Sequence, residues 1–274
     1  MVVRWAEGKV TGRAVELHVR RVVGTDAPPV LLLHGLGVGG VVWQPFARRL
    51  LPHLAAVAPD MRGHGQSDAP PDAYALADYA ADLVDVVPPG TPVVGHSLGA
   101  LVAVALAELF ADRVSWLVLL DPPLDAERRN SDVPTVYRLR HAPPGELERY
   151  LEDVNPGGGR LLAETLAKLF RQASDAAFQA LLEAPPGSPE TWERAPRVRQ
   201  PCLLIQADPR QGGVLGDAAA EAFVSRLPAG RRHKVRGPHA LHASHPAEVA
   251  SAVLSFGGYS SGASAGPPAS ADSR

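Results

Sequence analysis

The sequence predicts a mostly parallel β-sheet flanked by helices, an α/β fold, with a helical segment inserted near the middle of the chain. Two continuous apolar runs, at residues 29–35 and 54–60, have the composition of strands that are covered on both faces. Apolar residues recur at helical spacing between these runs, as they do where strands alternate with helices. The strand pattern then disappears between residues 122 and 197, where proline, charge and amphipathic helix patterns replace it.

The first half of the chain alternates strand and helix. Within the stretch 14–22, apolar and polar side chains alternate from Val15 to Val19, which is typical of a half-buried antiparallel strand. After the two apolar runs, the order continues with a helix at 76–87, a short strand at 92–94, an apolar helix after Ser97 and a strand at 114–121. This order favours a parallel sheet, because parallel neighbours need a long crossover connection such as a helix.

The rest of the chain divides into three parts. Residues 122–197 carry amphipathic helix stripes and are predicted to form a helical cap, or lid, over the carboxyl edge of the sheet. Residues 198–256 return to the strand and helix alternation, so that residues 1–121 and 198–256 together form the core. Residues 257–274 are predicted to be a disordered low-complexity tail, because they contain too little apolar surface to fold.

Composition narrows the functional classes. The chain has 274 residues, of which 46% are hydrophobic and 20% are charged, and its formal net charge is −2. These values fit a globular protein and give no electrostatic basis for binding nucleic acid or an anionic membrane. Cys202 is the single cysteine, which excludes an intramolecular disulfide and a cysteine-based metal site. The N-terminal residues have no apolar stretch of signal-peptide length, and we expect a cytoplasmic location.

The stretch VVGHSLGALV, at residues 93–102, places Ser97 between Gly95 and Gly99. This G-x-S-x-G pattern is typical of a sharp turn between a strand and a helix, where the serine hydroxyl projects clear of the sheet. Small flanking residues allow the helix to pack close against the strand. Ser97 is therefore the predicted nucleophile.

A serine nucleophile needs a base, and the base needs an acid that orients it. His239, which follows a predicted strand in GPHALHASHP, is the favoured base, and His242 is the other candidate. Asp208, at the end of the strand CLLIQA, is the favoured acid on the chain order Ser, Asp, His, although an Asp-Pro turn that caps its own loop is the alternative. Asp121, which ends another strand, is the second candidate, and Asp217 fits a helix N-cap better.

Hydrolysis by a serine also needs backbone N–H donors for the charge that develops on the carbonyl oxygen. Leu98 directly follows the serine, and its N–H is the first predicted donor. The turn HGLGVGG at 34–40 has the backbone freedom to supply the second, from Leu36. The same turn lacks the Lys-Ser/Thr pair that a phosphate-binding loop requires.

Four motifs, in this order and spacing, resemble those of the α/β-hydrolase family: LLLHGLG at 31–37, DMRGHGQSD at 60–68, GHSLG at 95–99 and GPHALHASHP at 237–246. The resemblance covers about residues 13–256 and implies an α/β-hydrolase fold with a lid. It also implies Ser97 as nucleophile, His239 as base, and Leu36 and Leu98 as oxyanion donors. One departure concerns the acid, since Arg210 stands where many members of the family have an aspartate.

The resemblance does not fix the reaction. We expect a serine hydrolase that cleaves a carboxylic ester, or a related lactone or thioester, through an acyl-enzyme. A cofactor-free perhydrolase, a C–C bond hydrolase and a non-catalytic ligand-binding protein are the alternatives. The expected partner is a small molecule with an apolar acyl or alkyl group. No cofactor, metal, nucleic acid or membrane is expected, and no oligomeric state is predicted.

Overall fold

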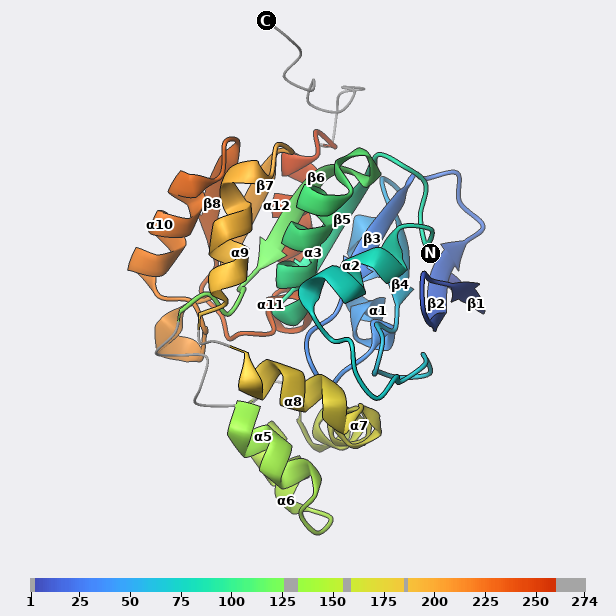
Figure 1. Cartoon of the computed structure of the whole chain (residues 1–274), viewed down its shortest axis with the longest axis vertical. Helices are drawn as coiled ribbons and strands as arrows, with labels where there is room; N and C mark the ends of the chain where they lie inside the picture. Colours follow the sequence, from blue (N-terminus) through green and yellow to red (C-terminus); the bar gives the residue numbers. More distant parts are fainter. Residues whose placement is uncertain (1–2, 126–132, 155–158, 185–186, 260–274) are drawn as a thin grey trace, which may run out of the picture.

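The computed structural model describes residues 3–125, 133–154, 159–184 and 187–259, and it has a single mixed sheet at its centre (Figure 1). The strands, in the spatial order β1-β2-β4-β3-β5-β6-β7-β8, are β1 (Arg4–Thr11), β2 (Glu16–Val23), β3 (Pro29–Leu33), β4 (Ala55–Pro59), β5 (Thr91–His96), β6 (Val114–Leu120), β7 (Cys202–Gln206) and β8 (Gly230–Lys234). β2 pairs antiparallel with β1 and β4, and the other neighbouring pairs are parallel. The prediction of a mostly parallel α/β sheet is confirmed.

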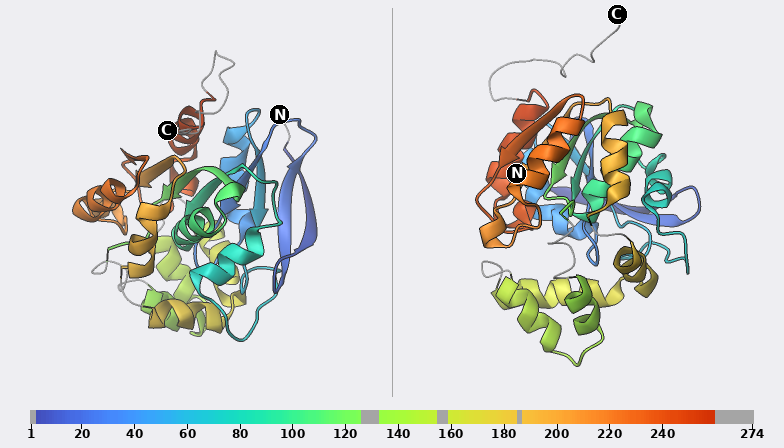
Figure 2. Two further views of the ribbon diagram at one scale, coloured as in Figure 1. Left: turned by 45° about the horizontal axis from the view of Figure 1, so that its top comes forward. Right: turned by 60° about the vertical axis from the view of Figure 1, so that its left-hand side comes forward.

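Helices cover both faces of this sheet (Figure 1; Figure 2). One face packs against η1 (Gly40–Trp43), α1 (Gln44–Leu50), α11 (Leu241–Ser244) and α12 (Pro246–Phe256). The other face packs against α2 (Leu76–Leu83), α3 (Leu98–Leu109), α9 (Pro189–Arg194), η3 (Ala195–Arg197) and α10 (Asp217–Arg226). The short helices η2 (Ala111–Arg113) and η4 (Pro209–Gln211) lie in connections.

The central strand β3 is apolar throughout, and both of its faces are buried. Along β3, Leu31 and Leu33 point into the core cluster beside α2 and α3, whereas Val30 and Leu32 point into the cluster beside α1 and α12. All four side chains are inaccessible to solvent. The two-sided burial explains why the apolar runs lack the alternation of a half-exposed strand.

Four further helices form a separate layer at the carboxyl edge of the sheet (Figure 1; Figure 2). These helices, which we call the cap, are α5 (Val133–Arg140), α6 (Glu146–Val154), α7 (Gly159–Gln172) and α8 (Asp175–Glu183). They pack around their own apolar cluster, which includes Leu147, Leu151 and Phe178. Helix α9, which the predicted insertion 122–197 included, packs against α3 instead, so the separate layer is shorter than that prediction.

The two ends of the chain also differ from expectation. β1 was not predicted, because most of its side chains are exposed and it is an edge strand that pairs only with β2. At the other end, the Tyr259 N–H donates to the Leu254 carbonyl at 2.8 Å, so residues 257–259 are ordered although the predicted tail began at 257. Residues 260–274 lie outside the described residues.

Cys202 begins β7, which lies between β6 and the edge strand β8, and its side chain is fully buried. Burial raises the pKa of the Cys202 thiol, since an ionised sulfur would lose its hydration there. Within the described residues, no helix combines the length and the hydropathy needed to cross a membrane.

Candidate active site

Ser97 lies on a sharp turn between β5 and α3. Its φ of 53° and ψ of −117° are rarely adopted by a residue with a side chain, so the turn is strained. A Cβ on Gly95 would collide with the backbone of Gly99, and a Cβ on Gly99 would collide with the backbone of Leu33. The strain persists because both glycines allow α3 to pack directly against β3 and β5.

His239 lies beside a carboxylate from a neighbouring loop. The Nδ1 atom of His239 is 2.7 Å from Oδ2 of Asp121, which directly follows β6. The Asp121 side chain is completely buried, whereas 31% of the His239 side chain is exposed. The Ala207 N–H donates to Oδ1 of Asp121 at 3.2 Å, and the Val214 N–H donates to Oδ2 at 2.9 Å. These donors fix the carboxylate in the position that orients the imidazole.

The expected pairing of Asp208 with His239 is therefore wrong, and Asp121 takes its place. Asp208 accepts a hydrogen bond from the Arg210 N–H at 3.0 Å, which is the self-capping Asp-Pro turn given as the alternative. This hydrogen bond lowers the pKa of Asp208. Asp217 is also not an N-cap: Gly216 occupies that position, and the Asp217 carboxylate pairs with Lys234 at 2.8 Å.

Two further histidines lie next to His239: His96, for which no catalytic role was predicted, and His242, the other candidate for the base. The His96 ring centroid is 4.5 Å from that of His239 and 4.6 Å from that of His242, and the His242 centroid is 4.3 Å from that of Trp43. The His96 Nε2–H donates to the His239 carbonyl at 3.1 Å. Burial lowers the pKa of His96 well below its ordinary value and that of His242 to about 3. Both are neutral at neutral pH, and within this group His239 has the carboxylate partner.

The glycine-rich turn at 34–40 approaches the serine closely. A Cβ added to Gly35 would lie 3.3 Å from the Ser97 Cβ. Leu98 is the first residue of α3, and N–H groups in the first turn of a helix have no acceptor within the helix. The segments that carry Leu36 and Leu98 therefore meet at Ser97. The cap contacts the same turn, since a Cβ on Gly37 would collide with Phe170 of α7.

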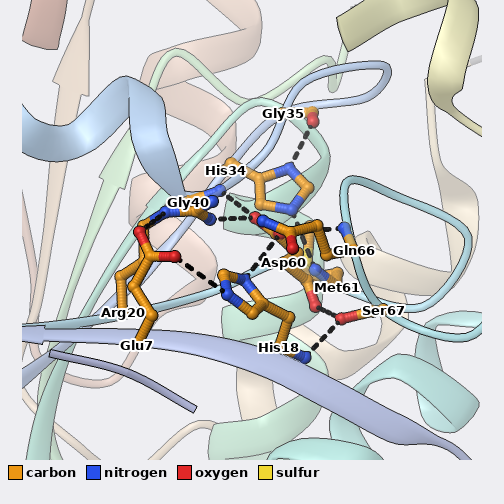
Figure 3. A network of polar contacts seen from close by, with 10 residues as sticks. All are labelled: Glu7, His18, Arg20, His34, Gly35, Gly40, Asp60, Met61, Gln66 and Ser67. Carbon is orange, nitrogen blue, oxygen red and sulfur yellow. Dashed lines mark hydrogen bonds and ion pairs between the residues drawn. The ribbon is translucent and has the colours of Figure 1, made fainter. Parts of the chain in front are cut away.

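The buried carboxylate of Asp60 binds the end of the turn at 34–40 (Figure 3). Asp60, only 1% exposed, accepts hydrogen bonds from the Gly40 N–H at 2.7 Å, the Arg20 guanidinium at 2.9 Å and the Gln66 N–H at 3.0 Å, and it lies 3.1 Å from His18 Nδ1. Burial alone would raise the pKa of Asp60, but the Gln66 hydrogen bond and the Arg20 charge reverse this and lower it. Asp60 is thus an anion at neutral pH that joins β2, β4 and the turn.

Two cavities lie between the core and the cap. One of about 480 Å³ separates α2 and α3 from α8 and α9, and its lining includes Tyr74, Tyr79, Leu98, Leu101 and Ala180. The second, of about 360 Å³, lies between the Asp60 network and α7. Among the residues that the structure describes, no three His, Cys, Asp or Glu side chains are grouped to hold a metal ion.

Comparisons with known proteins agree with this architecture. The family described as having the alpha/beta hydrolase fold matches residues 28–203, and the chain belongs to this family. A pimeloyl-[acyl-carrier protein] methyl ester esterase of Aromatoleum aromaticum is 31% identical over 247 residues, which are 82% of this chain and 96% of that protein. The naproxen esterase of Bacillus subtilis has a similar structure, with a TM-score of 0.78 at 21% identity, covering 93% of this chain and 92% of that one.

Other relatives match over a shorter length. An uncharacterised protein of Mycobacterium bovis is 37% identical over 129 residues, which are 46% of this chain and only 36% of that protein. The chain therefore spans about a third of the length of that relative. Taken together, the comparisons show that the chain has the alpha/beta hydrolase fold.

Proposed function

We propose that the protein hydrolyses carboxylic esters through an acyl-enzyme, with Ser97 as nucleophile, His239 as base and Asp121 as the orienting acid. The observation that carries this proposal is the 2.7 Å contact between Asp121 Oδ2 and His239 Nδ1, next to the strained turn that presents Ser97. A buried carboxylate, a partly exposed imidazole and a serine on a strand-to-helix turn are the parts that activate a hydroxyl nucleophile.

In the first half of the reaction, the Ser97 oxygen attacks the ester carbonyl and His239 Nε2 takes the hydroxyl proton. The Nδ1–H of His239 donates to Asp121, which favours the imidazolium that forms without itself becoming protonated. His239 then gives the proton to the departing alkoxide, which leaves Ser97 acylated. In the second half, His239 removes a proton from water and the water oxygen attacks the acyl carbon. The bond between this carbon and the Ser97 oxygen then breaks, and His239 returns the proton to the Ser97 oxygen as the acid leaves.

The negative charge on the carbonyl oxygen needs donors that are already oriented. The N–H groups of Leu36 and Leu98 are the proposed donors, because their segments meet at Ser97. The N-terminus of α3 adds a favourable dipole at the same position.

The acyl group of the proposed substrate is apolar. The 480 Å³ cavity supports this, since it reaches Leu98 and most of its lining is aliphatic or aromatic. The relative from Aromatoleum aromaticum is named as a methyl ester esterase, which favours an ester over other acyl compounds. Lactones and thioesters are the comparison substrates, because their hydrolysis passes through the same kind of tetrahedral intermediate.

The test is active-site labelling followed by turnover. A fluorophosphonate should label the wild-type protein and fail to label Ser97→Ala, while Ser225→Ala, which removes an exposed serine of α10, keeps full labelling. Turnover is then measured on p-nitrophenyl esters of increasing length, a lactone and an acyl thioester. A wild-type protein that takes no label and turns over none of these substrates would be a binding protein, and the proposal would be wrong.

A further inference from the structure

His34 is a buried histidine that the proposed reaction does not use. Its side chain is inaccessible to solvent, its Nδ1 atom is 2.7 Å from the Gly35 carbonyl oxygen, and its Nε2 atom is 2.9 Å from the Met61 nitrogen (Figure 3). A backbone nitrogen can only donate here, so Nε2 is the acceptor and the ring proton lies on Nδ1. His34 therefore donates to Gly35. Burial lowers the pKa of His34, which keeps a single proton on the ring at neutral pH.

The Gly35 carbonyl is one half of the peptide unit whose other half is the Leu36 N–H. In a planar trans peptide these two groups point in opposite directions. A donor that holds the carbonyl on one side of the chain therefore holds the N–H on the other. Glycine at 35 and 37, the latter with a φ of 79°, leaves the chain itself free to rotate this peptide. The orientation therefore has to come from a hydrogen bond to the peptide rather than from the backbone itself.

We propose that His34 is a positioning residue that fixes the rotation of the Gly35–Leu36 peptide and so aims the Leu36 N–H at the oxyanion site beside Ser97. This inference rests on the proposed function, in which Leu36 is an oxyanion donor. This peptide lies close to the nucleophile, because the atoms nearest to the missing Cβ of Gly35 are His96 Nδ1 at 3.2 Å and the Ser97 Cβ at 3.3 Å.

The support behind His34 comes from the Asp60 network. Met61, whose N–H fixes the His34 tautomer, directly follows Asp60, and the Asp60 carboxylate accepts the Gly40 N–H at the far end of the same turn. Two residues that directly follow β4 therefore hold the turn at 34–40. Met61 binds the imidazole of His34 at its start, and the carboxylate of Asp60 binds Gly40 at its end. This arrangement suits a donor that must be in place before the charge develops.

Two substitutions separate the two hydrogen bonds of His34. In His34→Asn the side-chain amide nitrogen reaches the position of Nδ1 and can still donate to Gly35. In His34→Gln the amide oxygen reaches the position of Nε2 and can still accept from Met61, but nothing donates to Gly35. Each variant keeps one of the two bonds, so a merely structural role for His34 predicts similar losses for both.

We expect His34→Gln to lose about 100-fold in kcat with little change in KM, since removing one oxyanion donor costs about that much, and His34→Asn to keep most of kcat. Rates are divided by the concentration of sites that a fluorophosphonate titrates, so that unfolded protein does not count. A trifluoromethyl ketone, whose hemiketal oxygen occupies the oxyanion site, should lose affinity in parallel with kcat. Equal kcat losses in the two variants would overturn the inference.

A measurement on the wild-type protein covers the case in which a variant does not fold. At neutral pH the nitrogen resonances of His34 should show a neutral ring with its proton on Nδ1. A ring that carries its proton on Nε2, or on both nitrogens, overturns the inference. These outcomes differ from a failure of the proposed function, in which the wild-type protein takes no label and has no esterase activity.

Discussion

Ser97 and Asp121 share an unfavourable backbone conformation, with φ values of 53° and 42°. Each follows the last residue of a central strand, β5 and β6, so the chain turns sharply at two adjacent points of the sheet edge. Such conformations cost about 1–3 kcal/mol each and persist where the surroundings determine them. The Ser97 N–H donates to the Leu120 carbonyl at 3.0 Å, which ties one turn to the other.

The acid is tested by replacing each candidate carboxylate with its amide. Asp121→Asn should lower kcat by a factor on the order of 10⁴, because an amide no longer favours the required tautomer and charge of His239. Asp208→Asn should keep near-wild-type kcat, since asparagine can also accept from the Arg210 N–H. The measurement is kcat on one activated ester, with the melting temperature of each variant recorded. If Asp208→Asn loses more kcat than Asp121→Asn, then Asp208 is the orienting acid and the proposed role of Asp121 is wrong.

The strain at Ser97 predicts an unusual stability difference. Ser97→Gly should have a free energy of unfolding higher than that of Ser97→Ala by about 1 kcal/mol, because glycine relieves the positive φ although it also adds entropy to the unfolded chain. Urea unfolding of the two inactive variants measures this difference. A less stable glycine variant would show that the turn is not strained.

Asp121 also shows why the acid was not predictable from the sequence. Asp121 and Asp208 both end central strands, β6 and β7, and both fit the chain order Ser, Asp, His. The choice depends on which way each loop turns after its strand. At Asp208 the carboxylate accepts a hydrogen bond within its own Asp-Pro turn. One indication against Asp208 was present in the sequence, because Arg210 stands where many members of the family have the acid. Ser97 and His239 were easier to propose, since their local patterns alone indicate their roles.

At the scale of elements, the cap is in direct contact with the turn at 34–40. Phe170 of α7 and Phe178 of α8 lie against Gly37, and Ala180 of α8 lines the 480 Å³ cavity. The identity of side chains on these helices should therefore change which acyl groups fit.

Filling the cavity should shorten the preferred acyl chain. Ala180→Phe adds a ring to the lining, so the kcat/KM for an octanoyl ester should fall about tenfold or more while that for the acetyl ester changes little. Leu182→Phe, at an exposed position of the same helix, is the matched control and should change neither value. Equal losses on both esters in Ala180→Phe would indicate that the cavity does not receive the acyl chain.

Elements with a strong internal pattern were predictable, and those held by pairing alone were not. β3 and β4 were found because burial on both faces leaves an apolar run. β1 gives no such run, and only its ladder with β2 makes it a strand. Helix α9 lies within the predicted helical insertion at 122–197, but nothing in its sequence showed that it would pack against α3 rather than join the cap.

Across the part of the molecule that the structure describes, burial lowers the pKa of four histidines: His34, His64, His96 and His242. Their pKa values are lowered mainly by burial, to about 3 for His64 and His242, from an ordinary value of 6.5. As the pH falls below 6.5, the unfolded chain binds protons that the folded chain excludes. The stability that these groups contribute is therefore complete above 6.5 and is lost between 6.5 and about 3.

This linkage can be measured with one substitution. In His242→Phe the free energy of unfolding should fall less steeply with decreasing pH than in the wild-type protein, by up to about 1.4 kcal/mol per pH unit. Phenylalanine keeps a ring between His96 and Trp43. His233→Gln, at an exposed position of β8, should leave the slope unchanged. An unchanged slope in His242→Phe would mean that His242 is charged in the folded protein.

The buried thiol of Cys202 makes the chain convenient for site-specific labelling. Its raised pKa and its place inside β7 keep it from reacting with maleimides while the protein is folded. A cysteine introduced by Leu182→Cys on the cap would then carry the dye alone, without removal of a native residue from the core. Fluorescence from that position would report movements of α8 during turnover, and delayed reaction at Cys202 would report global unfolding in the same sample.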